Sequence, residues 1–223
     1  NAFWAIRSKF SPKEYAGKMI HTWALNRVDG FYGEFFPLAM AKRSMKTFST
    51  ATDFDFGYTP DTAYFTLDGM FKQDFPKIAS ELTLNHLENY NYHDEWNIPV
   101  APEAYRRDLK FFGDQYSNFN AGKILLFIEG LAGISYSLPD GVLQVRDAMP
   151  TAWNWMEVEV PVGKKPAWVK VRIERKNERG GTVKSIVVKN SPLRVKIAPW
   201  LEGRQLVGEP QLKGDGFSES DTV

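Results

Sequence analysis

The residues best suited to chemistry gather in residues 84–122, where acidic side chains alternate with aromatic rings and amides. The acidic residues are Glu88, Asp94, Glu95, Glu103, Asp108 and Asp114. The aromatic residues are Tyr90, Tyr92, Trp96, Tyr105, Phe111, Phe112, Tyr116 and Phe119. Long irregular segments between helices are usually functional or disordered, and disordered segments are poor in aromatic residues. Flat rings suit the C–H faces of a sugar, and carboxylates and amides suit its hydroxyls. A surface loop with solvated acids is the competing interpretation.

Individual residues in and near this segment have a functional and a structural interpretation. Trp96 and Tyr116 can stack on sugar rings or pack within the loop. Asp61, at the start of a predicted helix, suits a substrate ligand or a helix cap. Four polar residues can either hydrogen-bond to sugar hydroxyls or stabilise turns and helix caps. They are Asp114, Gln115, Asn118 and Asn120.

Other kinds of site find no support in the sequence. His93 adjoins Asp94 and Glu95, but adjacent loop residues lack a defined ligand geometry, and the chain has only 3 histidines. Without cysteine, neither a disulfide framework nor a thiolate metal site can form. The glycine-rich segments fit no phosphate loop, and no serine lies in a G-x-S-x-G setting. We therefore expect neither a metal nor a cofactor.

Composition narrows the class of protein. The chain has 223 residues, which suffice for one large domain or two small ones, and 28 Lys and Arg residues balance 27 Asp and Glu residues. This balance argues against nucleic acid or a membrane surface as the main partner. No apolar run approaches the roughly 18 residues that a membrane span requires. The absence of cysteine fits a reducing compartment and a secreted bacterial protein alike, and we favour a secreted or periplasmic location.

Two helices are expected in the first part of the chain. Ser11-Pro12-Lys13-Glu14 has the pattern of a capping box that opens the first helix, and Asp29-Gly30 ends it. A long connection follows, with one helical turn predicted around residues 38–46. The second helix is predicted over residues 61–73, with one apolar face formed by Ala63, Tyr64, Leu67, Met70 and Phe71.

Two more helices flank the polar segment. The third is expected to be capped by Asp74, with Pro76 in its first turn. The fourth is expected to begin at Asn120 and to carry an apolar stripe of Ala121, Ile124, Leu125, Ile128 and Leu131. Residues 1–133 are therefore predicted to form a helical domain. Its start at Asn1 leads directly into an apolar cluster, so we expect further sequence upstream that covers this cluster.

After residue 133 the apolar period changes from helical to alternating. Alternation marks residues 143–146, 156–160, 168–173, 182–189 and 193–197, with Gly- and Pro-containing turns between them. Five or six short strands at this spacing predict an antiparallel sheet or sandwich over residues 134–207. Residues 208–223 are predicted to be a flexible tail. The expected class is thus α+β with several domains.

Three short motifs, in order, resemble those of the (α/α)6-toroid glycosidases of glycoside hydrolase family 63 and their inverting relatives. Residues 57–64 (GYTPDTAY) occupy the place of a motif near Y-W-R-G-P-V-W, in which Thr59 and Pro60 replace Trp and Arg. Glu88-Asn89-Tyr90 matches an E-N-Y motif, and residues 117–122 (SNFNAG) are similar to N-F-S-W-S-A, with Asn120 in place of Trp. The resemblance covers about residues 12–132.

The resemblance implies the last section of a toroid of paired helices, followed by a β module. It implies that Glu88 is the general base of an inverting hydrolysis of an O-glycosidic bond in an oligo- or polysaccharide. It also implies that the general acid lies upstream, in the N-terminal part of the same protein or in a partner chain that completes the toroid. Sugar contacts are expected from Tyr58, Asp61, Tyr90, Trp96, Asp114, Tyr116, Asn118 and Asn120.

Two alternatives remain open at the level of sequence. The altered Trp and Arg positions favour a non-catalytic carbohydrate-binding or structural fragment of a toroid. A polysaccharide lyase, whose toroids also join β modules, would need a Tyr or His base, for example Tyr58 or His93.

Overall fold

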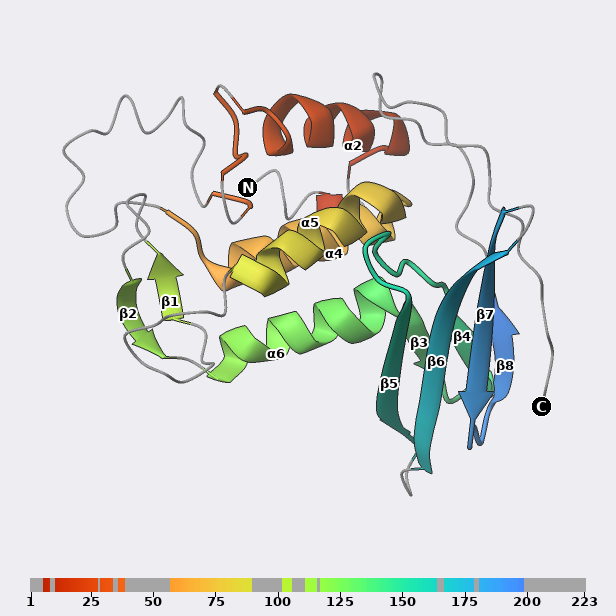
Figure 1. Ribbon diagram of the computed structural model, residues 1–223. Coiled ribbons are helices and arrows are strands. Elements are labelled where there is room, and N and C mark those ends of the chain that lie inside the picture. The colour runs from red at the N-terminus through yellow and green to blue at the C-terminus, as the bar shows by residue number, and fades with distance from the viewer. Residues whose placement is uncertain are drawn as a thin grey trace. The chain divides into compact units, whose positions relative to one another are not determined.

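The computed structural model describes residues 6–8, 11–27, 29–33, 36–38, 57–89, 102–105, 111–115, 117–163, 167–178 and 181–198. They form two compact units, which divide in sequence between Leu126 and Phe127. Unit 1 is built mainly from helices and unit 2 mainly from strands (Figure 1). The expected combination of helices and strands is therefore present.

The first helix of unit 1, α2 (Lys13–Met19), continues as a π-helical segment, η1 (Ile20–Ala24). Its fully buried residues recur at every fourth position, at Ala16, Ile20 and Ala24. Tyr15 and Trp23, which precede two of these positions by one residue, are exposed. The apolar face predicted from the sequence, Tyr15, Met19, Ile20, Trp23 and Ala24, is therefore correct at Ile20 and Ala24 and wrong at Tyr15 and Trp23.

Both predicted ends of this helix are wrong. Pro12 occupies the N-cap position and no side chain caps the helix, so Ser11 does not form the expected capping box. The helix ends near Leu25, before Asp29, because a wide π-type turn closes it. In this turn the N–H of Leu25 donates to the carbonyl of Ile20 at 2.9 Å.

Helices α4 (Pro60–Lys72) and α5 (Pro76–Asn89) form a hairpin, which confirms the second and third predicted helices. Proline at the first position of each helix fits the φ required there and sacrifices no hydrogen bond. Asp74, predicted to cap α5, instead adopts a left-handed φ of 63° after the end of α4. The N–H groups of Asp74 and Phe75 donate to the carbonyls of Phe71 and Met70 at 3.1 and 3.0 Å. This is a Schellman motif, and it reverses the chain within residues 73–75.

Residues 6–8 contact α4 and the residue after it through hydrogen bonds and an ion pair. Arg7 Nε donates to the Asp68 carboxylate at 2.6 Å, and Lys72 Nζ donates to the same oxygen at 2.7 Å. The Gln73 side-chain amide donates to the carbonyl of Ile6 at 2.9 Å. The buried Asp68 carboxylate therefore has two cationic partners, as a buried charge requires.

Helix α6 (Ser117–Leu125) continues as a second π-helical segment, η2 (Leu126–Leu131). It begins before Asn120, the predicted cap. Gly122 lies against Tyr64 of α4, where an added Cβ would be 3.2 Å from the Tyr64 Cβ. The predicted stripe is partly wrong, because Ala121 and Ile124 are exposed, whereas Lys123 and Leu126 are buried.

The polar segment before α6 contains regular structure that the sequence did not reveal. Strands β1 (Pro102–Tyr105) and β2 (Phe111–Gln115) pair antiparallel, with Tyr105 opposite Phe111. Earlier in the chain, Leu38 forms an isolated antiparallel bridge with Tyr58. The rest of the helical turn predicted around residues 38–46 lies outside the described residues.

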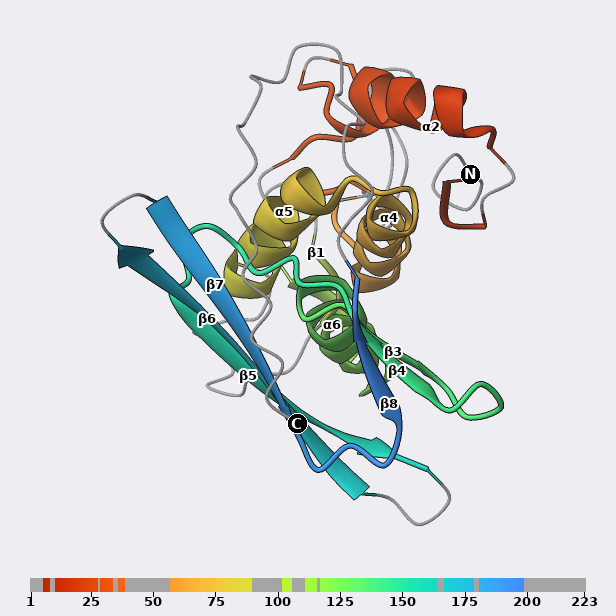
Figure 2. The same cartoon turned by 90° about the vertical axis from the view of Figure 1, so that its right-hand side faces the viewer.

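Unit 2 contains two sheets of three strands (Figure 2). One is a meander of β5 (Trp155–Val162), β6 (Ala167–Glu178) and β7 (Gly181–Lys189). The other joins β3 (Ile134–Ser137), β4 (Val142–Val145) and β8 (Arg194–Ile197). All five predicted strands are confirmed. The prediction of a wholly antiparallel arrangement is wrong at one place, because β8 pairs parallel with β4.

The connection between these two sheets of unit 2 is held by side chains of β6 and β7. The guanidinium of Arg175 donates to four backbone carbonyls, those of Met149, Pro150, Thr151 and Trp153. Lys184 Nζ lies 2.7 Å from the Asp147 carboxylate, whose side chain is only 1% exposed. These contacts satisfy the polar groups of a connection without regular structure.

Two glycines in left-handed conformations provide a matched test of the fold of unit 2. Gly133 and Gly141 have φ of 60° and 62°. An added Cβ would collide with the Arg146 carbonyl at Gly133 and would meet nothing within 4 Å at Gly141. We expect Gly141→Ala to lower the free energy of unfolding by about 1 kcal/mol, from backbone strain alone. We expect Gly133→Ala to lower it by about 3 kcal/mol or more, because the collision adds to the strain.

Urea denaturation followed by tryptophan fluorescence measures both effects. Equal losses in the two variants would contradict the close approach of Gly133 to Arg146.

Candidate functional site

The three motifs of the sequence lie at one end of the helices of unit 1. Helices α4 and α5 are antiparallel, because a short turn joins them, so the start of α4 lies beside the end of α5. Helix α6 contacts α4 and runs in the same direction (Figure 1). The start of α6 therefore reaches the same end. The strand β2 finishes two residues before α6, which brings its last residues there as well.

Two carboxylates stand open to solvent at this end. Glu88 is exposed in the last turn of α5, and Asp61 is exposed in the first turn of α4. The Asp61 carboxylate accepts the N–H of Thr62 at 2.8 Å. Asp61 therefore satisfies a backbone donor at a helix start, where negative charge is also favoured. The Glu88 carboxylate is accessible to water, as a group that activates a water molecule must be.

Tyr58 is placed differently from the two carboxylates. It is 5% exposed, and its phenol ring lies against Gly33, at a spot where no Cβ could be accommodated. Its backbone pairs with Leu38. Tyr58 thus packs the segment that leads into α4 against Gly33 and Leu38.

The remaining predicted contacts are located only in part. Tyr90, Trp96 and Tyr116 lie outside the described residues, as does His93. The backbone places Asp114 on β2 and both Asn118 and Asn120 near the start of α6, but their side chains lie outside the described part of the chain. Their contacts with sugar stay predictions.

A buried lysine is the titratable group that the sequence analysis missed. Lys123 of α6 is 6% exposed, and burial lowers its pKa to about 7. An amine with this pKa exists in both protonation states near neutral pH, so it can take up or release a proton. Lys123 stands between Gly122 and Ile124 and interrupts an apolar pattern. That interruption is the only signal in the sequence, and it also suits a lysine that extends to solvent.

Helix α5 carries a buried polar face, which does not include the exposed Glu88. Ser80, Thr83 and His86 recur at every third position, and all three are buried. The Ser80 hydroxyl donates to the Lys77 carbonyl at 2.8 Å. The Thr83 hydroxyl makes no hydrogen bond to any of the described residues.

Two kinds of feature are absent from the described residues. They contain no group of three or more His, Asp or Glu side chains that could hold a metal ion. No helix among them has the length and apolar character needed to cross a membrane.

Comparison of the chain with protein-family models, curated proteins and solved structures gave no match. The resemblance to toroid glycosidases therefore rests on the three motifs and on their order along the chain. The structure shows only where these motifs lie, which is at the ends of α4, α5 and α6.

The titration of Lys123 predicts a pH dependence of stability. Its pKa is lowered from 10.5 to about 7 by burial. Between these values the unfolded chain binds more protons, so Lys123 makes the free energy of unfolding rise with pH across this window. Below the window the amine is charged in both states, and the penalty of burying it is fully present.

We expect Lys123→Met to lose this rise. The measured quantity is the free energy of unfolding of the variant minus that of the native chain. This difference should be highest near about pH 6 and lower by at least about 1 kcal/mol near about pH 10. Urea denaturation across this range measures the difference. Lys189→Met, which alters an exposed lysine, is the matched control and should run parallel to the native chain. Parallel curves for Lys123→Met would contradict the lowered pKa.

Proposed function

We propose that this chain forms the closing helical section of a glycoside hydrolase, in which α4, α5 and α6 belong to an (α/α)6 toroid. The observation that carries the proposal is the convergence of three helix ends. These ends bear Asp61, Glu88 and residues 117–120, which are the positions of the three motifs. A ring of paired helices uses one end of its inner helices to line a cleft, and in this proposal the three helix ends would form one side of such a cleft. In the same proposal the two sheets of unit 2 form a β-sandwich module.

In this proposal Glu88 is the general base of an inverting reaction. Its carboxylate removes a proton from a water molecule, and the oxygen of that water attacks the anomeric carbon from the face opposite the leaving group. A second, protonated carboxyl group must lie roughly 6.5–9.5 Å away to donate to the leaving oxygen. That acid belongs to the N-terminal part of the same protein or to a partner chain. The exposure of Glu88 supports this role, because water has access to its carboxylate.

The substrate in this proposal is an oligo- or polysaccharide. Asp61 would bind a sugar hydroxyl beside Glu88. Further contacts come from polar and aromatic residues of the adjoining segments, Tyr90, Trp96, Asp114, Tyr116, Asn118 and Asn120. Rings and amides together match the two kinds of surface that a sugar presents.

A non-catalytic carbohydrate-binding fragment is the second candidate. It is favoured by the placement of Tyr58, whose ring packs against Gly33 inside unit 1 instead of standing at the helix ends. The same burial argues against Tyr58 as the base of a polysaccharide lyase. Unsaturated sugar products would nevertheless identify a lyase directly.

Replacement of Glu88 by Gln tests the catalytic proposal. In the protein that contains this chain, we expect Glu88→Gln to lower the rate of oligosaccharide hydrolysis by at least about a hundredfold, because the amide cannot accept a proton from water. The melting temperature and sugar affinity should stay close to the native values, since the side chain is exposed. Chromatography of the products and NMR of their anomeric configuration are the measurements.

Glu81→Gln, about two turns earlier on α5, is the matched control and should leave the rate unchanged. A rate retained in Glu88→Gln would remove the assignment of the base. Sugar binding without turnover in the native protein would establish the non-catalytic alternative.

A further inference from the structure

One face of the β5–β6–β7 sheet carries side chains that the proposed catalytic site does not use. The register pairs Trp155 with Glu174 and Pro161 with Trp168. Paired residues in an antiparallel sheet share a face, and residues two apart along a strand share it as well. Both tryptophans therefore belong to the same face. The opposite face of β5 and β6 is buried and consists of Met156, Val158, Val160, Val162, Val169, Val171 and Ile173.

The two indole rings stand at opposite ends of this outer face. Trp155 is 57% exposed and Trp168 is 59% exposed. Trp168 pairs with a residue six positions beyond Trp155 along β5. At the rise of an extended strand, this separation is about 20 Å. The Arg172 guanidinium lies 4.9 Å from the centre of the Trp155 ring and helps to hold that ring in place.

Between the indole rings lies a ladder of ion pairs. Lys170 Nζ is 3.0 Å from the Glu157 carboxylate and 2.9 Å from the Glu159 carboxylate. Arg172 is 2.6 Å from the Glu174 carboxylate and 3.4 Å from that of Glu157. Each of these carboxylates has a cationic partner across or along the strands. The ladder therefore presents fixed hydrogen-bond donors and acceptors side by side.

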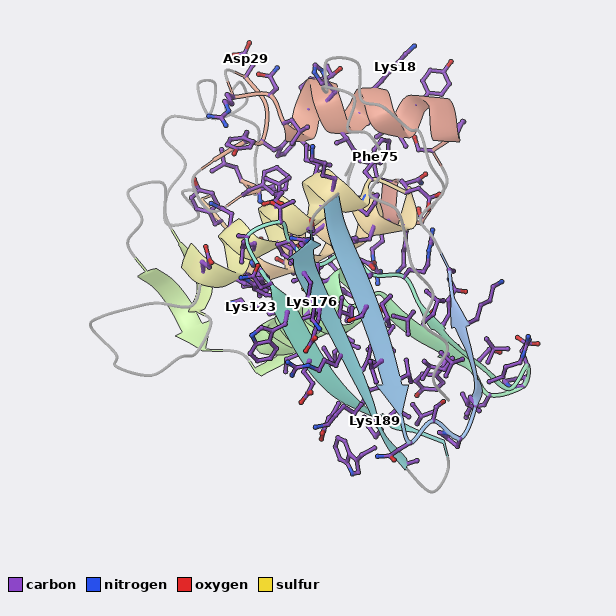
Figure 3. All side chains as sticks on the ribbon, turned by 45° about the vertical axis from the view of Figure 1, so that its right-hand side comes forward. Lys18, Asp29, Phe75, Lys123, Lys176 and Lys189 are labelled. Atoms are coloured by element: carbon purple, nitrogen blue, oxygen red, sulfur yellow. The ribbon has the colours of Figure 1, made fainter. Side chains whose placement is uncertain are left out.

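The charges of the face nearly cancel. Lys176 and Lys189 are exposed at its margins (Figure 3). Among the residues of this face whose side chains are described, four cations, at positions 170, 172, 176 and 189, stand against three carboxylates, at positions 157, 159 and 174, so the charges nearly balance. A surface with this balance lacks the dense positive charge that nucleic acid requires and the excess charge of one sign that an acidic or basic protein would match.

We propose that this outer face of β5 and β6 binds an extended, uncharged polysaccharide chain. Each indole ring stacks on one sugar residue, and the ion-pair ladder exchanges hydrogen bonds with the hydroxyls of the sugars between them. The wide separation of the two rings favours this occupant over a protein, since a protein interface usually centres on a contiguous apolar core. The nearly neutral charge of the face complements a ligand without charge. This proposal goes beyond the catalytic one and does not depend on Glu88.

Electrophoresis of the full chain through native gels that contain a polysaccharide tests the proposal. The uncharged probes are soluble starch, mixed-linkage β-glucan, xylan and galactomannan, and the charged probes are heparin and polygalacturonate. We expect at least one uncharged probe to retard the native chain. The double variant Trp155→Ala/Trp168→Ala should lose about tenfold or more in affinity, because the aromatic anchors carry most of the binding energy.

Tyr136→Ala is the matched control, since Tyr136 is an exposed aromatic residue on the other sheet of unit 2. It should leave the retardation unchanged. Thermal melting should show that the variants fold, as expected for exposed side chains, and each single tryptophan variant should show an intermediate loss.

Three outcomes would overturn the proposal. They are no retardation by any uncharged probe, equal retardation of the double variant, and retardation by the charged probes alone. Tryptophan-dependent self-association in analytical ultracentrifugation, without retardation, would assign the face to a second copy of the chain instead. Loss of hydrolysis in Glu88→Gln with retardation intact would separate this surface from the catalytic proposal.

Discussion

Unit 1 depends on close packing around helix α4. Ala63, Leu67, Met70 and Phe71 of this helix are buried, and so are its polar residues Thr66 and Asp68. A buried carboxylate is stable only with partners, and Asp68 has them in Arg7 and Lys72. Gly69 leaves room for the backbone at Arg7, where an added Cβ would be 3.1 Å from the Arg7 nitrogen, and Gly122 lets α6 approach Tyr64. Small residues at these two contacts fix the distance of two other segments from α4.

The direction of the helices follows from this packing and places the candidate site. The Schellman motif at residues 73–75 turns α5 back along α4, and α6 then lies along α4 in the same direction. The start of α4, the end of α5 and the start of α6 therefore lie at one place in unit 1. Glu88 and Asp61 owe their common location to the turn at the opposite end of the hairpin. A site built in this way is sensitive to helix packing as well as to its own residues.

Unit 2 follows a different rule, in which alternation along the strands decides which side chains are buried. Aliphatic residues at every second position of β5 and β6 form a buried face, and the residues between them form the face with Trp155 and Trp168. A shift of one residue in register would exchange the two faces. The ion pairs between Glu157, Lys170 and Arg172 exist only in the observed register. The same pairing therefore determines the core of the sheet and the composition of its outer surface.

Apart from the strands β1, β2 and β3, which it missed, the sequence by itself determined the type of the main elements, because these types depend on local periodicity and on proline. It predicted the α4–α5 hairpin, a helix near α6 and five strands, with errors of a few residues at their ends. It did not predict the π-helical segments η1 and η2 or the exposure of Tyr15 and Ile124, since such features depend on packing rather than on a local pattern. Nor did it predict the burial of Lys123 and Tyr58 or the parallel pairing of β8 with β4. Only the tertiary structure decided these features, because each arises from contacts between segments far apart in the chain.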